Sequence, residues 1–118
     1  MKKEVIYYSG CSMGGFETNE LLENNKAKVS TLEMGEKFTD IKEYKILTFW
    51  DRIEEIGIWK WKKDYTNPVA MTDGYDWELK LRDRKGRAKY CKGYESYPRK
   101  FKDFIKELNY LFGSKIEF

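Results

Sequence analysis

The alternation of apolar and polar positions is clearest over residues 75–82, where every second side chain is large and apolar. A period of two is typical of a strand with one buried face. Residues 83–86 have turn chemistry, since Gly86 tolerates a positive φ, and residues 87–92 return as a second strand. We expect this hairpin to supply the sheet side of the core through Trp77, Leu79, Leu81 and Tyr90.

The N-terminal part of the chain carries shorter strand patterns. β-Branched and aromatic residues predict a first strand over 4–9, and weaker alternation predicts three more over 16–23, 27–32 and 37–41. The glycine-rich segment 10–15 joins the first two. A hairpin loop is preferred there to an anion-binding nest, because the glycine spacing matches no phosphate-binding motif.

Two segments have the period of a helix. Residues 44–56 carry an apolar stripe, and Gly57 stands where a helix would end. Pro98 is placed at or near the first position of a second helix, which ends before Gly113. Its apolar positions are Phe101, Phe104, Ile105, Leu108, Leu111 and Phe112. The expected fold is a single α+β domain over 1–118, with a predominantly antiparallel sheet of five or six strands and two helices packed on one face.

Composition removes much chemistry. The chain has no histidine and two cysteines among its 118 residues, so it lacks an imidazole base and any Cys₄ or imidazole zinc site. No apolar run approaches the roughly 20 residues that cross a bilayer. We therefore expect a cytoplasmic protein with free thiols, and no cofactor, metal or membrane partner.

Four motifs punctuate the second half: Trp-x-Trp at 59–61, Asn-Pro at 67–68, Asp-Gly-x-x-Trp-x-Leu at 73–79, and Gly-x-x-x-Tyr-Pro-x-x-Phe at 93–101. In these motifs the chain resembles a group of small uncharacterised bacterial proteins of the Firmicutes type. The resemblance implies a single α+β domain and no particular activity.

Aromatic residues make up 17% of the chain and gather around the segment 58–75 and the turn before the last helix. Residues 58–62 alternate, so Trp59 and Trp61 are expected to point the same way beside a long loop over 63–74. Long loops are often functional, and Trp and Tyr are favoured interface anchors. The leading hypothesis is a non-enzymatic binding module for a protein or small ligand, with a site at Trp59, Trp61, Tyr65, Asn67, Tyr94 and Tyr97. A simple lid over the core fits the same pattern, and both interpretations stay open.

Positive charge concentrates in the second half. Residues 80–106 hold 11 Lys or Arg against 3 Asp or Glu, a net charge of +8, although the whole chain carries only +3. A compact cationic hairpin can meet phosphates. The alternative hypothesis is therefore nucleic-acid binding through Lys80, Arg82, Arg84, Lys85, Arg87 and Lys89. The competing interpretation is a solvated charged face.

Catalysis is the least favoured class. The carboxylates Asp73, Asp76 and Glu78 surround Trp77 and resemble the paired acids of some hydrolases, but cross-strand ion pairs explain them more simply. Cys11 and Cys91 lack a histidine base and are interpreted as unreactive thiols.

Overall fold

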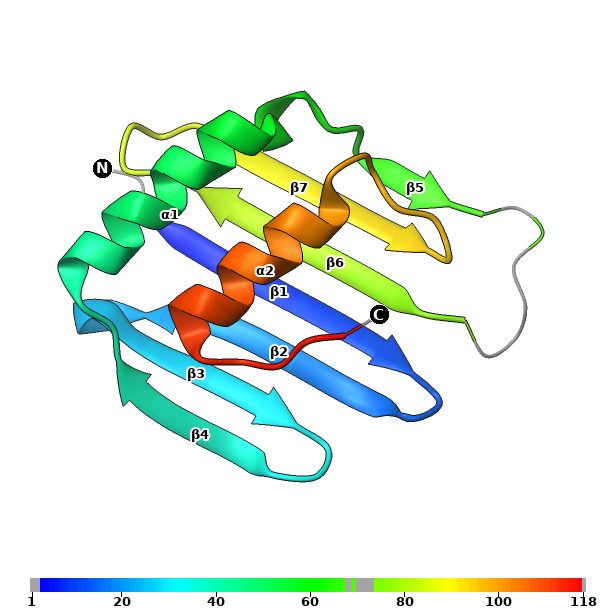
Figure 1. Ribbon diagram of the computed structural model, residues 1–118, viewed down its shortest axis with the longest axis horizontal. Coiled ribbons are helices and arrows are strands. Elements are labelled where there is room, and N and C mark those ends of the chain that lie inside the picture. Colours follow the sequence, from blue (N-terminus) through cyan, green and yellow to red (C-terminus); the bar gives the residue numbers. More distant parts are fainter. Residues whose placement is uncertain (1–2, 68, 70–73, 118) are drawn as a thin grey trace.

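Seven strands form one sheet in the computed structural model, which describes residues 3–67, 69 and 74–117 (Figure 1). Their order across the sheet is β4-β3-β2-β1-β6-β7-β5. The strands are β1 (Val5–Ser12), β2 (Gly15–Leu22), β3 (Lys26–Thr31), β4 (Gly35–Asp40), β5 (Asp64–Thr66), β6 (Asp76–Arg82) and β7 (Ala88–Tyr94). The first four make an antiparallel meander, and β1 then pairs antiparallel with β6.

The α+β class is confirmed, but the expected strand number and the antiparallel character were incomplete. The sheet is mixed, because β5 runs parallel to β7 at the edge. Strand β5 lies within residues 63–74, the segment expected to be a loop. Lys92 N donates to Lys63 O and Asn67 N donates to Tyr94 O, which extends the short pairing at both ends. Three residues are too few to show a period in the sequence.

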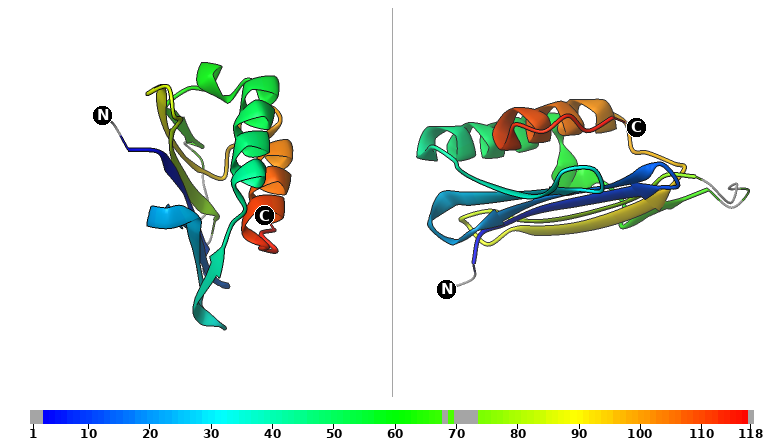
Figure 2. Two further views of the ribbon diagram at one scale, coloured as in Figure 1. Left: turned by 90° about the vertical axis from the view of Figure 1, so that its left-hand side faces the viewer. Right: turned by 90° about the horizontal axis from the view of Figure 1, so that it is seen from below.

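Both helices lie on the same face of the sheet, as Figure 2 shows. Helix α1 (Glu43–Ile56) ends at Gly57, whose φ is 83°, and helix α2 (Phe101–Phe112) ends at Gly113, whose φ is 68°. Pro98 precedes α2 by a turn instead of starting it, and its carbonyl accepts a hydrogen bond from Phe101 N. No helix in the described part of the chain is long and apolar enough to cross a bilayer.

The core lies between the helices and the central strands. The buried face of α2 packs on Tyr8 and Trp77: the Trp77 and Phe101 rings are 4.7 Å apart, and the Tyr8 and Phe104 rings 6.1 Å. The expected role of Tyr90 in this core was wrong. Leu79 pairs with Cys91 in the register, so Cys91 faces the helices, fully buried, and Tyr90 faces the other way.

Two glycines make room for the large rings of the core. Gly10 and Gly93 flank Trp77 in the strand register. A β-carbon at Gly93 would lie 2.5 Å from Trp77 Nε1, and one at Gly10 would overlap the Tyr75 hydroxyl. Each ring therefore lies across bare backbone, a close approach that only glycine permits.

The helices do not cover their whole side of the sheet. In Figure 1 the hairpin of β3 and β4 projects beyond them, and the C-terminal tail crosses β1 and β2 at this border. The opposite side, which we call the open face, is covered by neither helix of the described chain (Figure 2). The fold thus offers two surfaces on which a partner can lie.

Candidate functional site

The structure separates the two tryptophans expected to act together. Residues Ile58–Lys60 form a 3₁₀ helix, not an extended strand. Trp61 is buried, with its ring 5.9 Å from that of Phe104. Trp59 is half-buried and stacks on Trp50 at 6.2 Å. The prediction that they point the same way was wrong, because a 3₁₀ turn changes the direction of successive side chains.

Asn67 and Tyr94, two further residues of the predicted aromatic site, form hydrogen bonds within the protein. Asn67 Oδ1 accepts from Val69 N, and Asn67 Nδ2 contacts Glu95 O at 3.5 Å. The Tyr94 hydroxyl accepts from Gly74 N. Pro68 and residues 70–73, including Asp73, lie outside the described residues.

Tyr65 and Tyr97 both pack on the ring of Trp77, at 6.0 and 6.5 Å. The Tyr65 hydroxyl also accepts from Lys62 N. Tyr97 donates to Glu95, and burial first, then the neighbouring carboxylate, raise the pKa of Tyr97 to about 12. Of the six predicted aromatic-site residues, Tyr97 is the one that lines the groove described below.

The cationic hairpin is divided between the two faces of the sheet. Arg82 pairs with Ala88, so Lys80 and Arg82 share the open face with Tyr90. Lys89 lies on the helix side, where its Nζ donates to Trp59 O. The single cationic face expected for the hairpin was therefore wrong.

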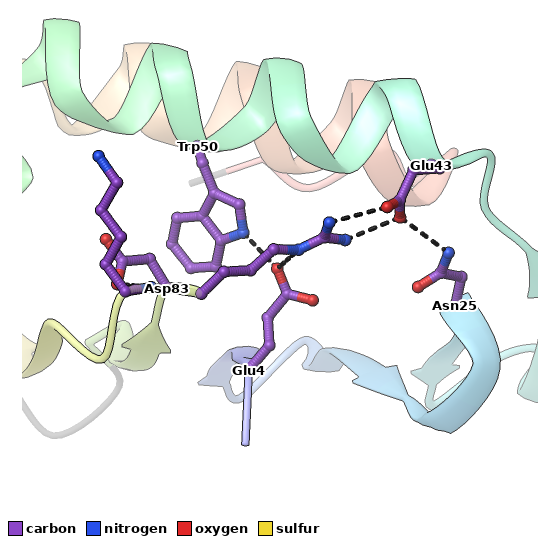
Figure 3. Close-up of polar contacts among 7 residues, drawn as sticks. Glu4, Asn25, Glu43, Trp50 and Asp83 are labelled. Carbon is purple, nitrogen blue, oxygen red and sulfur yellow. Dashed lines mark hydrogen bonds and ion pairs between the residues drawn. The ribbon is translucent and has the colours of Figure 1, made fainter. Parts of the chain in front are cut away.

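Arg84 is held in an ion-pair cluster that we call the clasp: Arg84 with Glu4, Asn25, Glu43 and Trp50 (Figure 3). Both terminal nitrogens of Arg84 donate to Glu43, at 2.7 and 2.8 Å, and Nε donates to Glu4 at 3.0 Å. Trp50 Nε1 also donates to Glu4, and Asn25 Nδ2 to Glu43. The bonds from Arg84, then that from Asn25, lower the pKa of Glu43 to about 2.

Arg87 is also paired with carboxylates of the protein. It donates to Asp83 at 2.9 Å and to Glu54 at 2.9 Å, and its guanidinium lies 4.6 Å from the Trp59 ring centroid. Asp83 is buried and also accepts backbone bonds from the turn. The two central arginines of the hairpin are therefore bound to carboxylates of the protein itself.

Lys80 has a different setting. On the open face its ammonium lies 5.4 Å from the Tyr7 ring and 5.9 Å from the Tyr90 ring. Tyr90 donates to Glu78, and Lys85 is exposed at the hairpin turn. The rings that lie beside the Lys80 cation on this face are therefore those of Tyr7 and Tyr90.

Among the described residues, the candidate catalytic groups do not form a closed site. Asp76 and Glu78 lie on the open face, beside a shallow hollow of about 430 Å³ that Cys11 also lines. Cys11 is exposed, and Cys91 is buried, so that burial raises the pKa of its thiol to about 11. The glycine-rich segment is the predicted hairpin: Ser12 pairs with Gly15.

A larger hollow lies on the helix side, and sequence patterns did not indicate it. This groove, of about 850 Å³, runs between β2, the β3–β4 hairpin and the C-terminal tail. Its apolar lining includes Val29, Leu32, Met34, Phe112 and Ile116. Its polar lining includes Glu17, Asn19, Tyr75, Glu95, Tyr97, Ser114, Lys37 and Lys115.

A chain of hydroxyl groups ends at a carboxylate in this groove. Tyr8 and Tyr75 hydroxyls are 2.7 Å apart, and Tyr75 donates to Glu17 at 2.7 Å. Glu17 is half-buried and has no cationic partner within the described residues. Burial raises its pKa, and the bond from Tyr75 opposes that shift only in part.

Asn19 lies two residues further along β2, on the same side of the strand as Glu17. It is fully buried, and its Oδ1 contacts the Ser114 hydroxyl of the tail. Its Nδ2 finds no acceptor in the part of the chain that the structure describes. A buried donor without a partner costs about 1–3 kcal/mol, so Asn19 lowers the stability of the fold.

The sequence did contain a signal for these residues. Asn19 interrupts the apolar alternation of the predicted second strand, and Glu17 occupies the same face. Two polar residues at core-facing positions are typical of a site, not of a structural strand. From the sequence alone, Asn19 weakens the strand pattern over 16–23 and does not indicate a groove.

Comparison of the chain with protein-family models, with curated proteins and with solved structures finds no match in any of the three. The resemblance to small bacterial proteins therefore stays a prediction.

Proposed function

We propose that this protein is a non-enzymatic binding module that holds a small ligand in the groove between β2, the β3–β4 hairpin and the C-terminal tail. The observation that carries the proposal is the half-buried, cation-free carboxyl of Glu17 inside a groove of about 850 Å³. Small-molecule sites typically have volumes of roughly 300–1,000 Å³, with apolar walls and a few placed polar groups. The proposed site is the groove and not the aromatic loop expected from the sequence, and Tyr97 belongs to both.

The groove favours binding over catalysis. Glu17 is engaged by Tyr75, and burial raises the pKa of Tyr75 above its ordinary value, so that this hydroxyl stays protonated. The protonated phenol and the carboxylates of Glu17 and Glu95 supply a hydrogen-bonding site, whereas a general acid–base pair would require groups poised near neutral pH.

A screen of small molecules by ¹H–¹⁵N NMR tests the proposal. We expect ligands to shift resonances of β2, β3 and residues 113–117. Val29→Trp fills the groove and is expected to abolish those shifts. Ser30→Trp, on the other face of the same strand, is the matched control and is expected to leave them. Ligands that shift other regions only, or that bind Val29→Trp unchanged, would contradict the proposal.

Nucleic-acid binding is a second candidate, now placed on the open face. It is supported by Lys80, whose ammonium lies between the rings of Tyr7 and Tyr90, with Arg82 on the same face. Rings and cations on one sheet face suit single-stranded bases and phosphates. The interspersed Glu78 and Asp76 oppose it, which is why it ranks second.

Fluorescence anisotropy of a labelled single-stranded RNA tests this candidate. Binding is expected to weaken steeply between 50 and 200 mM salt, as phosphate contacts do. Lys80→Glu is expected to weaken it at least about tenfold, whereas Lys106→Glu on exposed α2 serves as the charge-matched control. Absence of binding at low salt would exclude this candidate.

A further inference from the structure

Polar groups lie together in the groove where β2 meets Tyr75 and Tyr97. There the Tyr75 hydroxyl donates to Glu17 at 2.7 Å, and the Tyr97 hydroxyl donates to Glu95 at 3.2 Å. The two rings are 6.5 Å apart and inclined by 34°. Two carboxylates and two electron-rich ring faces thus lie together.

Neither carboxylate forms an ion pair with a described residue. This differs from Glu4, Glu43, Glu54 and Asp83, which all pair with arginine. A half-buried carboxylate needs a counter-charge to offset its lost hydration. At Glu17 the described residues supply a hydroxyl but no cation.

A second, independent observation points to a ligand in the same groove. Asn19 is fully buried, lines the groove and keeps Nδ2 without an acceptor among the described residues. Glu17 and Asn19 are two positions apart on one strand face, a spacing of about 7 Å. Within this short distance β2 therefore presents both an unmatched negative charge and an unmatched donor.

We propose that the ligand of the groove is an organic cation, an ammonium group on an apolar body, with the ammonium held between Glu17 and the rings of Tyr75 and Tyr97. This inference rests on the proposed function of the groove. Carboxylates and tyrosine faces are the groups that recognise ammonium ions. The apolar body packs along Val29, Phe112 and Ile116, which line the remainder of the groove.

An anionic ligand is the principal alternative, because Lys37 and Lys115 also line the groove. Both lysines are exposed, so water already solvates their charges. Glu17 is half-buried, and an interaction with a desolvated charge is stronger than one with a solvated charge. The buried part of the groove therefore selects a cation.

Three probes with the same apolar body separate these possibilities: 4-phenylbutylamine, 4-phenylbutan-1-ol and 4-phenylbutyrate. Their affinities for the full chain are measured by NMR titration. We expect the amine to bind at least about tenfold tighter than the alcohol, and the carboxylate to bind weakest. The amine is expected to shift β2 and the residues around Tyr97.

Glu17→Gln keeps the size and hydrogen bonding of the side chain and removes its charge. It is expected to reduce the advantage of the amine over the alcohol to about twofold or less. Glu20→Gln, on the same strand but the open face, is the matched control and is expected to retain the full advantage.

Equal binding of the three probes in the groove, or tighter binding of the carboxylate, would overturn the cation inference and leave the binding function standing. Retention of the amine's advantage in Glu17→Gln would overturn it too. If no probe shifts a groove resonance, both the inference and the proposed function fail.

Discussion

Glu43 in the clasp and Glu17 in the groove carry the same functional group in opposite surroundings. Glu43 is exposed, yet Arg84 and Asn25 bind it from two other elements. Glu17 is half-buried, and a tyrosine hydroxyl is its one hydrogen-bonding partner within the described chain. The pKa of Glu43 falls to about 2, whereas that of Glu17 rises.

Under the proposed function, the difference is one between a charge that joins elements of the fold and a charge left for a ligand. The clasp joins α1, the start of β1 and the β6–β7 turn, and its carboxylates are matched by Arg84 (Figure 3). In the groove the shape is kept by rings and backbone, while the charge of Glu17 is left unmatched. Proteins commonly give up stability of this kind at functional sites.

The largest expected effect comes from Gly10→Ala, which removes the space under Tyr75. The added methyl group would overlap the Tyr75 hydroxyl, so Tyr75 must leave both Tyr8 and Glu17. Overpacking of this kind costs about 1–3 kcal/mol. Urea denaturation measures the loss; Gly14→Ala, where a β-carbon meets no atom closer than 3.8 Å, is the control. Equal stability of the two variants would show that Tyr75 is not fixed as described.

A smaller effect is expected from Arg84→Met, which breaks the clasp and keeps much of the side-chain length. Glu4 and Glu43 would lose their cation, although the exposure of the cluster limits the loss to about 0.5–1 kcal/mol. Ligand binding in the groove should not change. Lys85→Met, one residue along the same turn, is the matched control for urea denaturation.

The two glutamates should respond to neutralisation with opposite signs. Glu43→Gln is expected to lower the melting temperature at pH 7, because the carboxylate is favoured in the folded state. Glu17→Gln is expected to raise stability by less than about 1 kcal/mol, since Glu17 is only half-buried and water screens much of its charge. Calorimetry of both variants tests the contrast, and a loss of stability in Glu17→Gln would contradict it.

The smallest effect is a difference in pH dependence. Glu43 has a pKa of about 2 in the fold against an ordinary 4.5, so its contribution is present above pH 4.5 and lost as the pH falls towards 2. The pKa of Glu17 lies above 4.5, so stability falls as the pH rises through that raised pKa. When the melting temperature is measured against pH, Glu43→Gln should lose the fall in stability below pH 4.5. Glu17→Gln should lose the fall in stability as the pH rises through the raised pKa.

Much of the fold was predictable, because long periodic segments carry strong signals. Helix α2 and strand β6 follow their apolar periods along their whole lengths. Hydrophobicity could not predict that Cys91, and not Tyr90, faces the core, because Lys89 and Lys92 lie on either side of this pair. Cross-strand partners decide it: Cys91 lies opposite Leu79, and Gly93 provides room for Trp77.

The candidate site was harder to predict than the fold. For Trp61 the sequence left open an interface anchor and a lid over the core, and the structure buries it under α2. The groove joins residues separated by about a hundred positions, such as Asn19 and Ser114. Such a juxtaposition arises from topology, which single-sequence patterns do not encode.

The pairing of β1 with β6 has a consequence for how the molecule assembles. Val5 lies opposite Arg82, so this step joins residues 77 positions apart, whereas β1 to β4 pair through short turns. Loop-closure entropy makes such a long-range pairing late and slow in folding. If the groove binds a ligand as proposed, that ligand would contact both the locally paired strands β2 and β3 and the distant residues Tyr75 and 113–117. Its binding energy would then oppose unfolding at the junction between them.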